Sequence, residues 1–186
     1  VKTEECWKET GKPPVKVRWI DINKGDEENP EYRSRLVAKE IKKDNRDDLF
    51  AATPPLEALR FIMSHAARMK QKEKNYKVLI NDVKRANFHA RIKRDVYIKL
   101  PEEDPRSSDP GACGRVVKTM YGTLDAAERF SAHYTATLEK AGFMAGNASP
   151  CHFHHPGHDV WVLVHGDDFL IVGRGVGRRH AVETLR

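Results

Sequence analysis

The sequence predicts an α+β domain in which helices pack on one face of an antiparallel sheet. Short apolar runs typical of strands are interrupted by two long amphipathic segments. Near the end of the chain, two intensely apolar runs, Val160–Val164 and Phe169–Val172, are separated by only four residues, which indicates an antiparallel hairpin. With 186 residues, 39% hydrophobic and 32% charged, the chain is long enough to bury the core of one domain.

Several protein classes are excluded by this composition. The longest apolar runs fall far below the roughly 20 residues that span a bilayer, so we expect no membrane association. The three cysteines, Cys6, Cys113 and Cys151, form neither a disulfide framework nor a CxxC metal pair, which favours a reducing compartment. There is no Met start and no targeting pattern, so we expect an unsecreted protein and a fragment of a longer one.

The N-terminal part is predicted to hold an arm followed by a hairpin. Residues 1–14 are polar and close on two prolines, so we interpret them as an arm or linker that precedes a domain over 15–186. Residues Val15–Ile22 and Tyr32–Ala38 alternate apolar and polar side chains around a stretch rich in turn formers, which predicts a β-hairpin. A charged connection over 39–52 follows.

The middle of the chain is predicted to form a helix and two strands. Thr53 is a candidate N-cap with Pro54 at the first helical position, and a helix should run to about Gln71. Its apolar face is expected to hold Leu56, Leu59, Met63 and Ala66. Tyr76–Val83 should form a short buried strand, Val96–Leu100 should form another, and 101–114 a surface loop.

A second helix is predicted from a capping box and an apolar face. Asp125 and Glu128 have the spacing of a capping box. Phe130, Tyr134, Leu138 and Ala141 then mark one face of a helix that ends at Gly142.

Three acidic residues are the strongest indication of chemistry. Asp167 and Asp168 lie between the two core strands of the final hairpin, where adjacent carboxylates favour a cation. Asp82 ends another apolar strand, so one sheet could bring all three together. Carboxylates are hard ligands that suit Mg²⁺, and such a group can hold two ions about 3.5–4 Å apart for phosphoryl transfer. The alternative is a solvent-exposed Gly-Asp-Asp turn.

The basic residues are concentrated in the first part of the chain. The net charge is +6 overall, and residues 1–100 hold 24 Lys and Arg against 16 Asp and Glu. Such an excess suits a polyanion, although an ordinary solvated surface explains it equally well. The candidate phosphate contacts follow the first aspartate: Lys84, Arg85, Arg91, Lys93 and Arg94.

Histidines gather around residue 155. Together with Cys151 they suggest a zinc site at first sight: His152, His154, His155 and His158. Their spacing matches no standard zinc finger, so we interpret them as surface histidines near the Pro156-Gly157 turn. The lone histidines His65, His133 and His180 lie on predicted helices and are expected to be packing or surface residues.

Blocks along nearly the whole chain resemble one known family. Three of them, in order, are similar to the fingers and palm of copia-type retrotransposon reverse transcriptases: YRSRLVAK at Tyr32–Lys39, NDVKRANFHARIKRDVYIKLPEE at Asn81–Glu103 and HGDDFLIVG at His165–Gly173. Two further landmarks of that family resemble TMYGTLDAAERF at Thr119–Phe130 and ASPCHFHH at Ala148–His155.

The resemblance implies a right-hand polymerase fold limited to fingers and palm. It implies an RNA-directed DNA polymerase that uses an RNA or DNA template with primer, deoxynucleoside triphosphates (dNTPs) and two Mg²⁺. It also implies an intracellular setting, in a cytoplasmic particle or the nucleus. The family continues into a thumb, a ribonuclease H domain and an integrase within one pol polyprotein. Because the thumb is absent from this chain, we expect weak or no processive synthesis.

The resemblance also assigns roles to residues. Asp82 and Asp167 would bridge the metal ions, Asp168 would complete the acidic site, and the backbone carbonyl of Val83 would be a further metal ligand. Arg35 falls on the fingers residue that contacts the incoming triphosphate, a task that suits a bidentate guanidinium. Asn87 falls where the family has an aromatic residue that excludes a 2′-hydroxyl.

Departures from the family pattern leave other functions open. Asp125 replaces a glutamine, Glu128 replaces a basic residue, and the capping-box spacing gives this pair a structural role. His165-Gly166 replaces tyrosine-valine before the paired aspartates, and glycine is expected to loosen the turn. These changes favour, as an alternative, a catalytically degenerate remnant that binds nucleic acid without turnover. A two-metal nuclease that uses the same aspartates is a third possibility.

Overall fold

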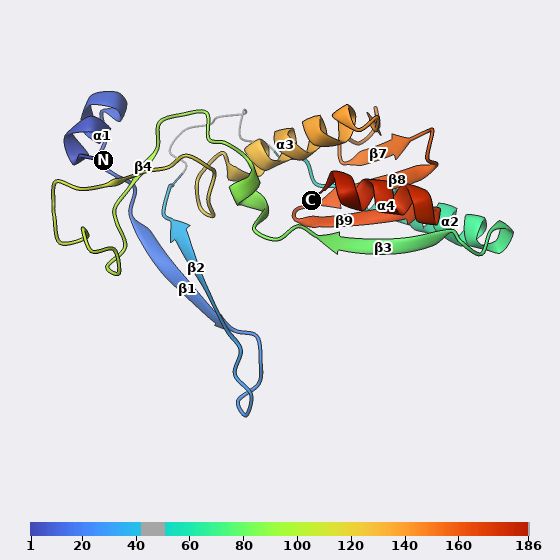
Figure 1. Cartoon of the computed structure of the whole chain (residues 1–186), viewed down its shortest axis with the longest axis horizontal. Coiled ribbons are helices and arrows are strands. Elements are labelled where there is room, and N and C mark those ends of the chain that lie inside the picture. The colour runs from blue at the N-terminus through green and yellow to red at the C-terminus, as the bar shows by residue number, and fades with distance from the viewer. Residues whose placement is uncertain (42–50, 186) are drawn as a thin grey trace. The chain divides into compact units, whose positions relative to one another are not determined.

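The structure, a computed structural model, describes residues 1–41 and 51–185 (Figure 1). Most of the predicted charged connection over 39–52 lies outside these residues. The chain divides into two compact units, the first formed by Val1–Leu49 with Asn87–Arg129 and the second by Phe50–Ala86 with Phe130–Arg186. In the described part of the chain, every helix is too short or too polar to cross a membrane.

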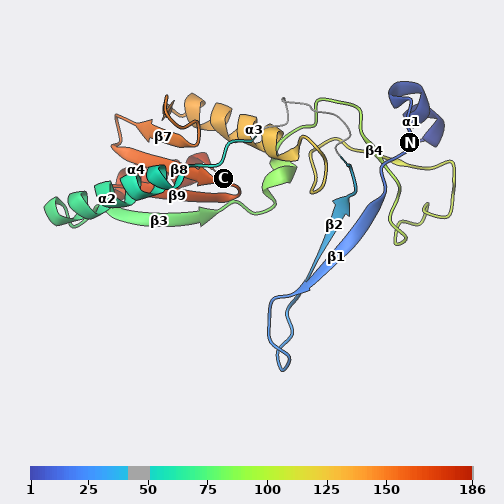
Figure 2. The same ribbon diagram turned by 180° about the vertical axis from the view of Figure 1, so that it is seen from behind.

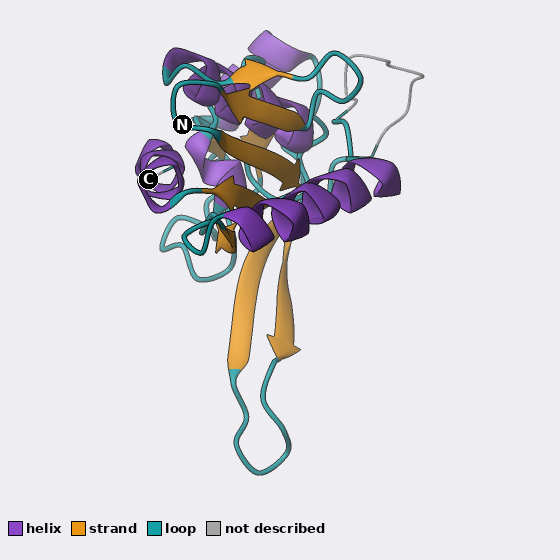
Figure 3. Cartoon of the chain, turned by 90° about the vertical axis from the view of Figure 1, so that its right-hand side faces the viewer, coloured by secondary structure: helices purple, strands orange, loops and turns teal. Residues whose placement is uncertain are grey.

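The first unit contains the predicted β-hairpin. Strands β1 (Val17–Asn23) and β2 (Tyr32–Ala38) pair antiparallel along their whole length, from Val17 opposite Ala38 to Asn23 opposite Tyr32. Figure 3 shows the hairpin as a long two-stranded ribbon. Two very short strands, β4 (Tyr97–Ile98) and β5 (Gly114–Arg115), form a second antiparallel pair.

Residues 1–14 differ from the arm or linker that the sequence suggests. They contain helix α1 (Thr3–Thr10), which ends at Gly11 in the left-handed conformation, with φ of 63°. Cys6 on this helix is 1% exposed and packs with Tyr97 and Cys113. The segment is therefore a folded part of the first unit, because its single buried side chain meets a small core that the local sequence does not reveal.

The second unit is built on a five-stranded antiparallel sheet in the order β3-β9-β8-β7-β6. The antiparallel sheet and the helices mixed with it confirm the α+β class. The central strands β8 (Val160–His165) and β9 (Asp168–Gly173) form the predicted hairpin. The outer strands flank this hairpin on both sides: β3 (Lys77–Asp82) next to β9, then β7 (His152–His155) and β6 (Met144–Ala145) next to β8.

Helices cover both faces of this sheet, so the expectation that they pack on one face is wrong. Helix α4 (Gly175–Thr184) lies in front of the sheet in Figure 1, and α2 (Leu56–Lys72) lies in front of it in Figure 2, which is the view from behind. Alternate residues of a strand point to opposite faces, and β8 and β9 are apolar at nearly every position. Val162 therefore packs in the core that includes α4 and α3 (Ala126–Lys140), whereas Leu163 packs in the core that includes α2.

Helix α2 begins later than predicted and buries a different face. It starts at Leu56, with Pro55 at the N-cap position and no side-chain cap. Thr53 and Pro54 stay outside the helix because each precedes a proline, and a residue before a proline is disfavoured in the helical region. Ile62 and Ala66 are its buried residues, while Leu56, Leu59 and Met63 are 53%, 40% and 45% exposed.

Strand β3 was expected to be buried and is instead the exposed edge of the sheet. Among the described strands it pairs with β9 alone, and its apolar side chains Val78, Leu79 and Ile80 are 39%, 36% and 69% exposed. A short apolar run does not distinguish an edge strand from a central one, since the difference depends on neighbours that are distant in the sequence.

The apolar face and the end of helix α3 are confirmed. Phe130, Tyr134 and Leu138 are buried in the larger core of the second unit. The chain then reverses at Gly142, where φ is 91° and the N–H of Phe143 donates to the carbonyl of Leu138 at 3.0 Å.

Candidate functional site

The turn between β8 and β9 carries the first acidic residues. His165 pairs with Asp168 across the hairpin, which leaves Gly166 and Asp167 as the two turn residues. Gly166 has a φ of 65°, the conformation that a hairpin turn with glycine at its first central position requires. A two-residue turn therefore forms here, and the expectation that glycine loosens it stays a prediction.

The sheet brings Asp82 to this turn. In the antiparallel pair of β3 and β9, Asp82 is the direct partner of Asp168. One residue further on, the N–H of Val83 donates a hydrogen bond of 3.0 Å to the backbone carbonyl of Asp167. Directly opposite residues in such a pair share a face, and like charges there are destabilising. All three predicted acidic residues thus lie at one end of the sheet.

The three carboxylates are open to solvent. All three residues are exposed, and within the described parts of the chain no hydrogen bond or ion pair engages their side chains. Among the same described residues, their oxygens do not form a group whose members all lie within 4.8 Å of one another. Carboxylate oxygens nonetheless fit Mg²⁺ chemically, since this ion binds through one or two carboxylates and keeps several waters.

Two buried side chains anchor the segment that follows Asp82. Val83 and Ala86 are buried in the larger core, so the chain is anchored directly behind the acidic residue. Arg85 between them has a φ of 56°, which is uncommon for a residue other than glycine. Lys84 and Arg85 are both exposed.

In the first unit, the ring of Tyr121 contacts Arg35 and Phe88, the residue that follows Asn87. The guanidinium of Arg35 lies 5.4 Å from the centroid of the Tyr121 ring, and Phe88 meets the same ring edge-on at 6.2 Å. Asn87 precedes Phe88, and its carbonyl accepts a hydrogen bond from the hydroxyl of Thr119. Tyr121 lies in the Thr119–Phe130 block that resembles the family, but the sequence alone predicts no role for it.

Arg94 has different partners from those expected. Its guanidinium donates to Glu40 at 2.5 and 2.6 Å and to Asp125 at 2.8 Å. Hydrogen bonds with Glu40, and then with Asp125, raise the pKa of Arg94. These contacts do not fit the predicted phosphate contact of Arg94.

The predicted capping box is also replaced by ion pairs. The carboxylate of Asp125 receives Arg94, and Glu128 binds its neighbour Arg129. Both acidic departures from the family pattern therefore have a structural role, although not the one that their spacing suggested. The remaining basic candidates of this unit, Arg91 and Lys93, are exposed.

Comparison with known protein families shows to which family the chain belongs. The family described as "Reverse transcriptase (RNA-dependent DNA polymerase)" matches residues 7–184. The chain belongs to this reverse transcriptase family. It is 26% identical over 175 residues to the retrovirus-related Pol polyprotein from transposon TNT 1-94 of Nicotiana tabacum. That match covers 90% of this chain and 13% of the relative.

These findings confirm the resemblance to retrotransposon reverse transcriptases that the sequence blocks indicated. The reverse transcriptase segment described here spans only a small part of the polyprotein that it matches. No solved structure matches it significantly.

Proposed function

We propose that the chain is the RNA-directed DNA polymerase segment of a retrotransposon, with Asp82, Asp167 and Asp168 as its catalytic acidic residues. The observation that carries the proposal is the direct pairing of Asp82 with Asp168, together with the hydrogen bond that ties Val83 to Asp167. Membership in the reverse transcriptase family supports the reaction, which transfers a nucleotidyl group from a dNTP to a primer 3′-hydroxyl.

The acidic residues hold the metal ions in this proposal. Two bound Mg²⁺ would supply charge stabilisation for the attacking and leaving oxygens. Asp82, Asp167 and Asp168 would hold the ions through their carboxylate oxygens, and the backbone carbonyl of Val83 would add a further oxygen ligand. The primer 3′-oxygen then forms its bond to the α-phosphorus while the bond to pyrophosphate breaks, so the protein contributes mainly positioning and charge.

Substrate contacts come from basic and polar side chains. Arg35 contacts the triphosphate through its guanidinium, which the Tyr121 ring supports from one side. Asn87 lies under the sugar. Lys84, Arg85, Arg91 and Lys93 contact template or primer phosphates, and we leave Arg94 out because two carboxylates already pair with it. The thumb, ribonuclease H and integrase of a pol polyprotein are the proposed covalent partners.

Primer extension on a homopolymeric RNA template with Mg²⁺ tests the proposal. We expect the chain to extend the primer weakly and Asp167→Asn to abolish the extension. Glu139→Gln, which removes an exposed negative charge from α3, is the matched control and should leave extension unchanged. Extension that persists in Asp167→Asn would overturn the catalytic assignment.

A catalytically degenerate remnant that binds nucleic acid is the second candidate. The presence of Asn87 and His165 at family landmarks favours it, as does the open spacing of the acidic side chains. Nucleic-acid binding that weakens with salt, without extension in either protein, would support this candidate. Degradation of the primer would instead support the two-metal nuclease.

A further inference from the structure

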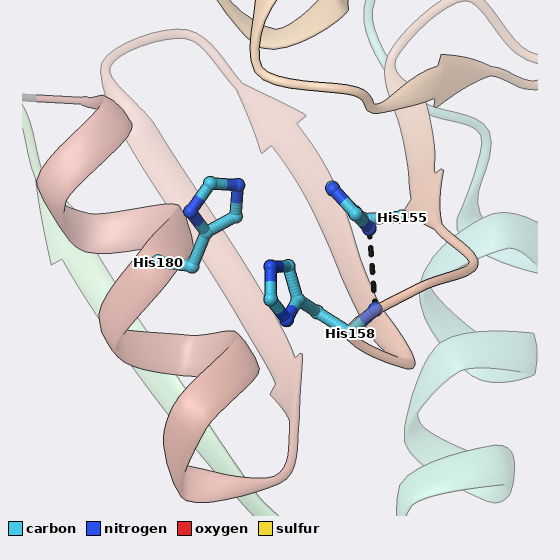
Figure 4. A group of neighbouring side chains, drawn as sticks. All are labelled: His155, His158 and His180. Carbon is cyan, nitrogen blue, oxygen red and sulfur yellow. Dashed lines mark hydrogen bonds between the residues drawn. The ribbon is translucent and has the colours of Figure 1, made fainter.

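Three histidines meet in the second unit, although one of them lies more than twenty residues from the other two in the sequence. His155 ends strand β7, His158 lies in the turn before β8, and His180 lies on α4 (Figure 4). One ring nitrogen of each residue lies within 4.8 Å of the others. The ring centroids are 4.5 Å apart for His155 and His158, 4.5 Å for His158 and His180, and 5.2 Å for His155 and His180.

Close packing of α4 on the turn creates this arrangement. A Cβ atom at Gly177 would lie 2.6 Å from the carbonyl oxygen of His158 and 2.9 Å from the Cβ of Val160, so only glycine allows the approach. His180 follows three residues later and therefore faces the same way on the helix. Ala181, which is fully buried, fixes this side of α4 against the core.

Neighbouring groups contact the rings of His155 and His180. The backbone N–H of His158 donates to Nδ1 of His155 at 3.2 Å, and the carbonyl of Ala141 lies 3.2 Å from Nε2 of His180. Phe143 stacks parallel to His180 at 5.9 Å and meets His155 edge-on at 5.1 Å. Metal-binding histidines typically donate one ring N–H to such a carbonyl, as His180 can to Ala141.

The surroundings of His155 disfavour its charged form. Burial, followed by the proximity of His158 and His180, lowers the pKa of His155. A neutral imidazole has a lone pair to give, which a protonated one lacks. Three half-buried imidazoles this close together can direct one nitrogen each at a shared cation.

From this geometry we infer that His155, His158 and His180 form a binding site for a Zn²⁺ ion, which joins the turn before β8 to helix α4. Three imidazoles and one water complete a tetrahedral zinc shell, whereas Mg²⁺ prefers oxygen ligands. Zinc–nitrogen bonds of about 2.0–2.1 Å would bring the three nitrogens to about 3.3 Å from one another, closer than the limit of 4.8 Å within which they now lie. The site is separate from the acidic residues and does not depend on the proposed function.

The other members of the histidine group are engaged elsewhere. The ring of His154 stacks on Trp161 at 3.9 Å, and His152 lies 5.1 Å from the same ring. Cys151 is fully buried, and its thiol donates to the carbonyl of Ala52 at 3.2 Å. His154 is therefore a control residue of the same type, close in sequence but outside the proposed site.

Competition with a coloured zinc chelator measures the affinity of the metal-free chain. We expect one tightly bound Zn²⁺ per chain, and at least tenfold weaker binding in both His158→Gln and His180→Gln. His154→Gln should bind zinc as the unchanged chain does. Equal weakening in His154→Gln, or the same affinity in the unchanged chain and in His158→Gln, would overturn the inference.

X-ray absorption at the zinc edge tests the ligands without any substitution. A shell of nitrogen and oxygen only, with the outer-shell scattering of three imidazoles, is the expected spectrum. A sulfur ligand, or fewer than three imidazoles, would contradict the assignment. Because this measurement uses the unchanged chain, it decides the question even if a variant fails to fold.

Discussion

Asp82 and Asp168 lie directly opposite each other in the antiparallel pair of β3 and β9. Two like charges in this position lower the stability of a sheet by a few tenths of a kcal/mol up to about 1 kcal/mol. Within the described residues no basic side chain pairs with either carboxylate. An arrangement that costs stability in the absence of a cation is typical of a site that binds one, as many functional sites trade stability for activity.

The backbone at Gly122 should not tolerate a side chain. Its φ is 81°, and a Cβ atom there would lie 1.9 Å from the carbonyl oxygen of Ala38. We expect Gly122→Ala to lower the free energy of unfolding by about 3 kcal/mol or more, which combines backbone strain with a steric clash. Gly11→Ala is the matched control, because Gly11 has a φ of 63° but open space around it and should cost only about 1 kcal/mol.

Urea unfolding of both glycine variants measures this difference. Equal losses of stability in Gly122→Ala and Gly11→Ala would show that the contact with Ala38 is not formed as described.

Arg94 should stabilise the first unit through its two carboxylate partners. Its side chain is 28% exposed, and those of Glu40 and Asp125 are 14% and 8% exposed. Arg94→Met leaves both carboxylates unpaired, and we expect the free energy of unfolding to fall by about 2–3 kcal/mol. Lys93→Met, the same change at an exposed neighbour, should alter it by less than about 0.5 kcal/mol.

Neutralising the partners should rescue much of that loss. In the triple variant Arg94→Met, Glu40→Gln and Asp125→Asn, no unpaired charge remains, so urea unfolding should show partial recovery. Further destabilisation in the triple variant would be inconsistent with the ion-pair explanation.

Tyr76 should make the second unit sensitive to alkaline pH. It is fully buried, and its hydroxyl lies 3.0 Å from Nε2 of His65. Burial, with the negative charge of Asp159 contributing, raises the pKa of Tyr76 to about 12 from its ordinary value of 10.0. The unfolded chain loses this proton first, so the stabilisation is complete below pH 10 and is lost as the pH rises towards 12.

The expected loss is about 2 kcal/mol between these pH values. Chemical unfolding at several pH values should show a shallower decline for Tyr76→Phe than for the unchanged chain. Tyr32→Phe, at a residue that is 73% exposed, should follow the unchanged chain. Parallel pH profiles for the unchanged chain and Tyr76→Phe would refute this prediction.

Under the proposed function, Asn87 should determine how well the chain excludes ribonucleotides. Asparagine is smaller than the aromatic residue that the family has at this position, so a 2′-hydroxyl would meet less hindrance. We expect Asn87→Tyr to raise the preference for dNTPs over ribonucleotides at least tenfold, measured as the ratio of kcat/KM values. Asn147→Tyr, at an exposed position, should leave the ratio unchanged.

This outcome also depends on the proposed function, because it requires extension to be measurable. A strong deoxyribonucleotide preference in the unchanged chain that Asn87→Tyr does not alter would count against the assignment of Asn87.

The parts of the fold that could be predicted are those that local pattern determines. The alternation in Val15–Ile22 and Tyr32–Ala38 predicts the β1–β2 hairpin, and Gly166 with its flanking apolar runs predicts the β8–β9 hairpin. Helix α3 was predictable because Phe130, Tyr134 and Leu138 follow the helical repeat up to Gly142. In each case the residues that decide the structure are neighbours in the sequence.

The parts that could not be predicted depend on distant neighbours. An apolar run such as Val78-Leu79-Ile80 is the same in a central and in an edge strand until the strand order is known. The burial of Cys6 depends on Tyr97 and Cys113, which a reading of residues 1–14 cannot reveal.

The candidate site likewise has parts that the sequence predicts and parts that it does not. The position of Asp82 next to the hairpin could be inferred, because apolar strands that end in carboxylates often share a sheet edge. The partners of Arg94 could not, since Glu40 and Asp125 lie far from it in the sequence. The grouping of His180 with His155 and His158 likewise depends on the packing of α4 against the turn.

Cleavage of the chain by bound iron tests the central claim most directly, because Fe²⁺ in place of Mg²⁺ reduces added hydrogen peroxide to hydroxyl radicals, which cut only the backbone close to the ion. The account predicts cuts both near Asp82 and near Asp167–Asp168, suppressed together by excess Mg²⁺ and lost together in Asp82→Asn. Cuts near His155 and His180 would be suppressed by Zn²⁺ instead and so are distinguishable. Cuts near only one of the two acidic segments, or cuts there that Mg²⁺ does not suppress, would contradict a shared metal site.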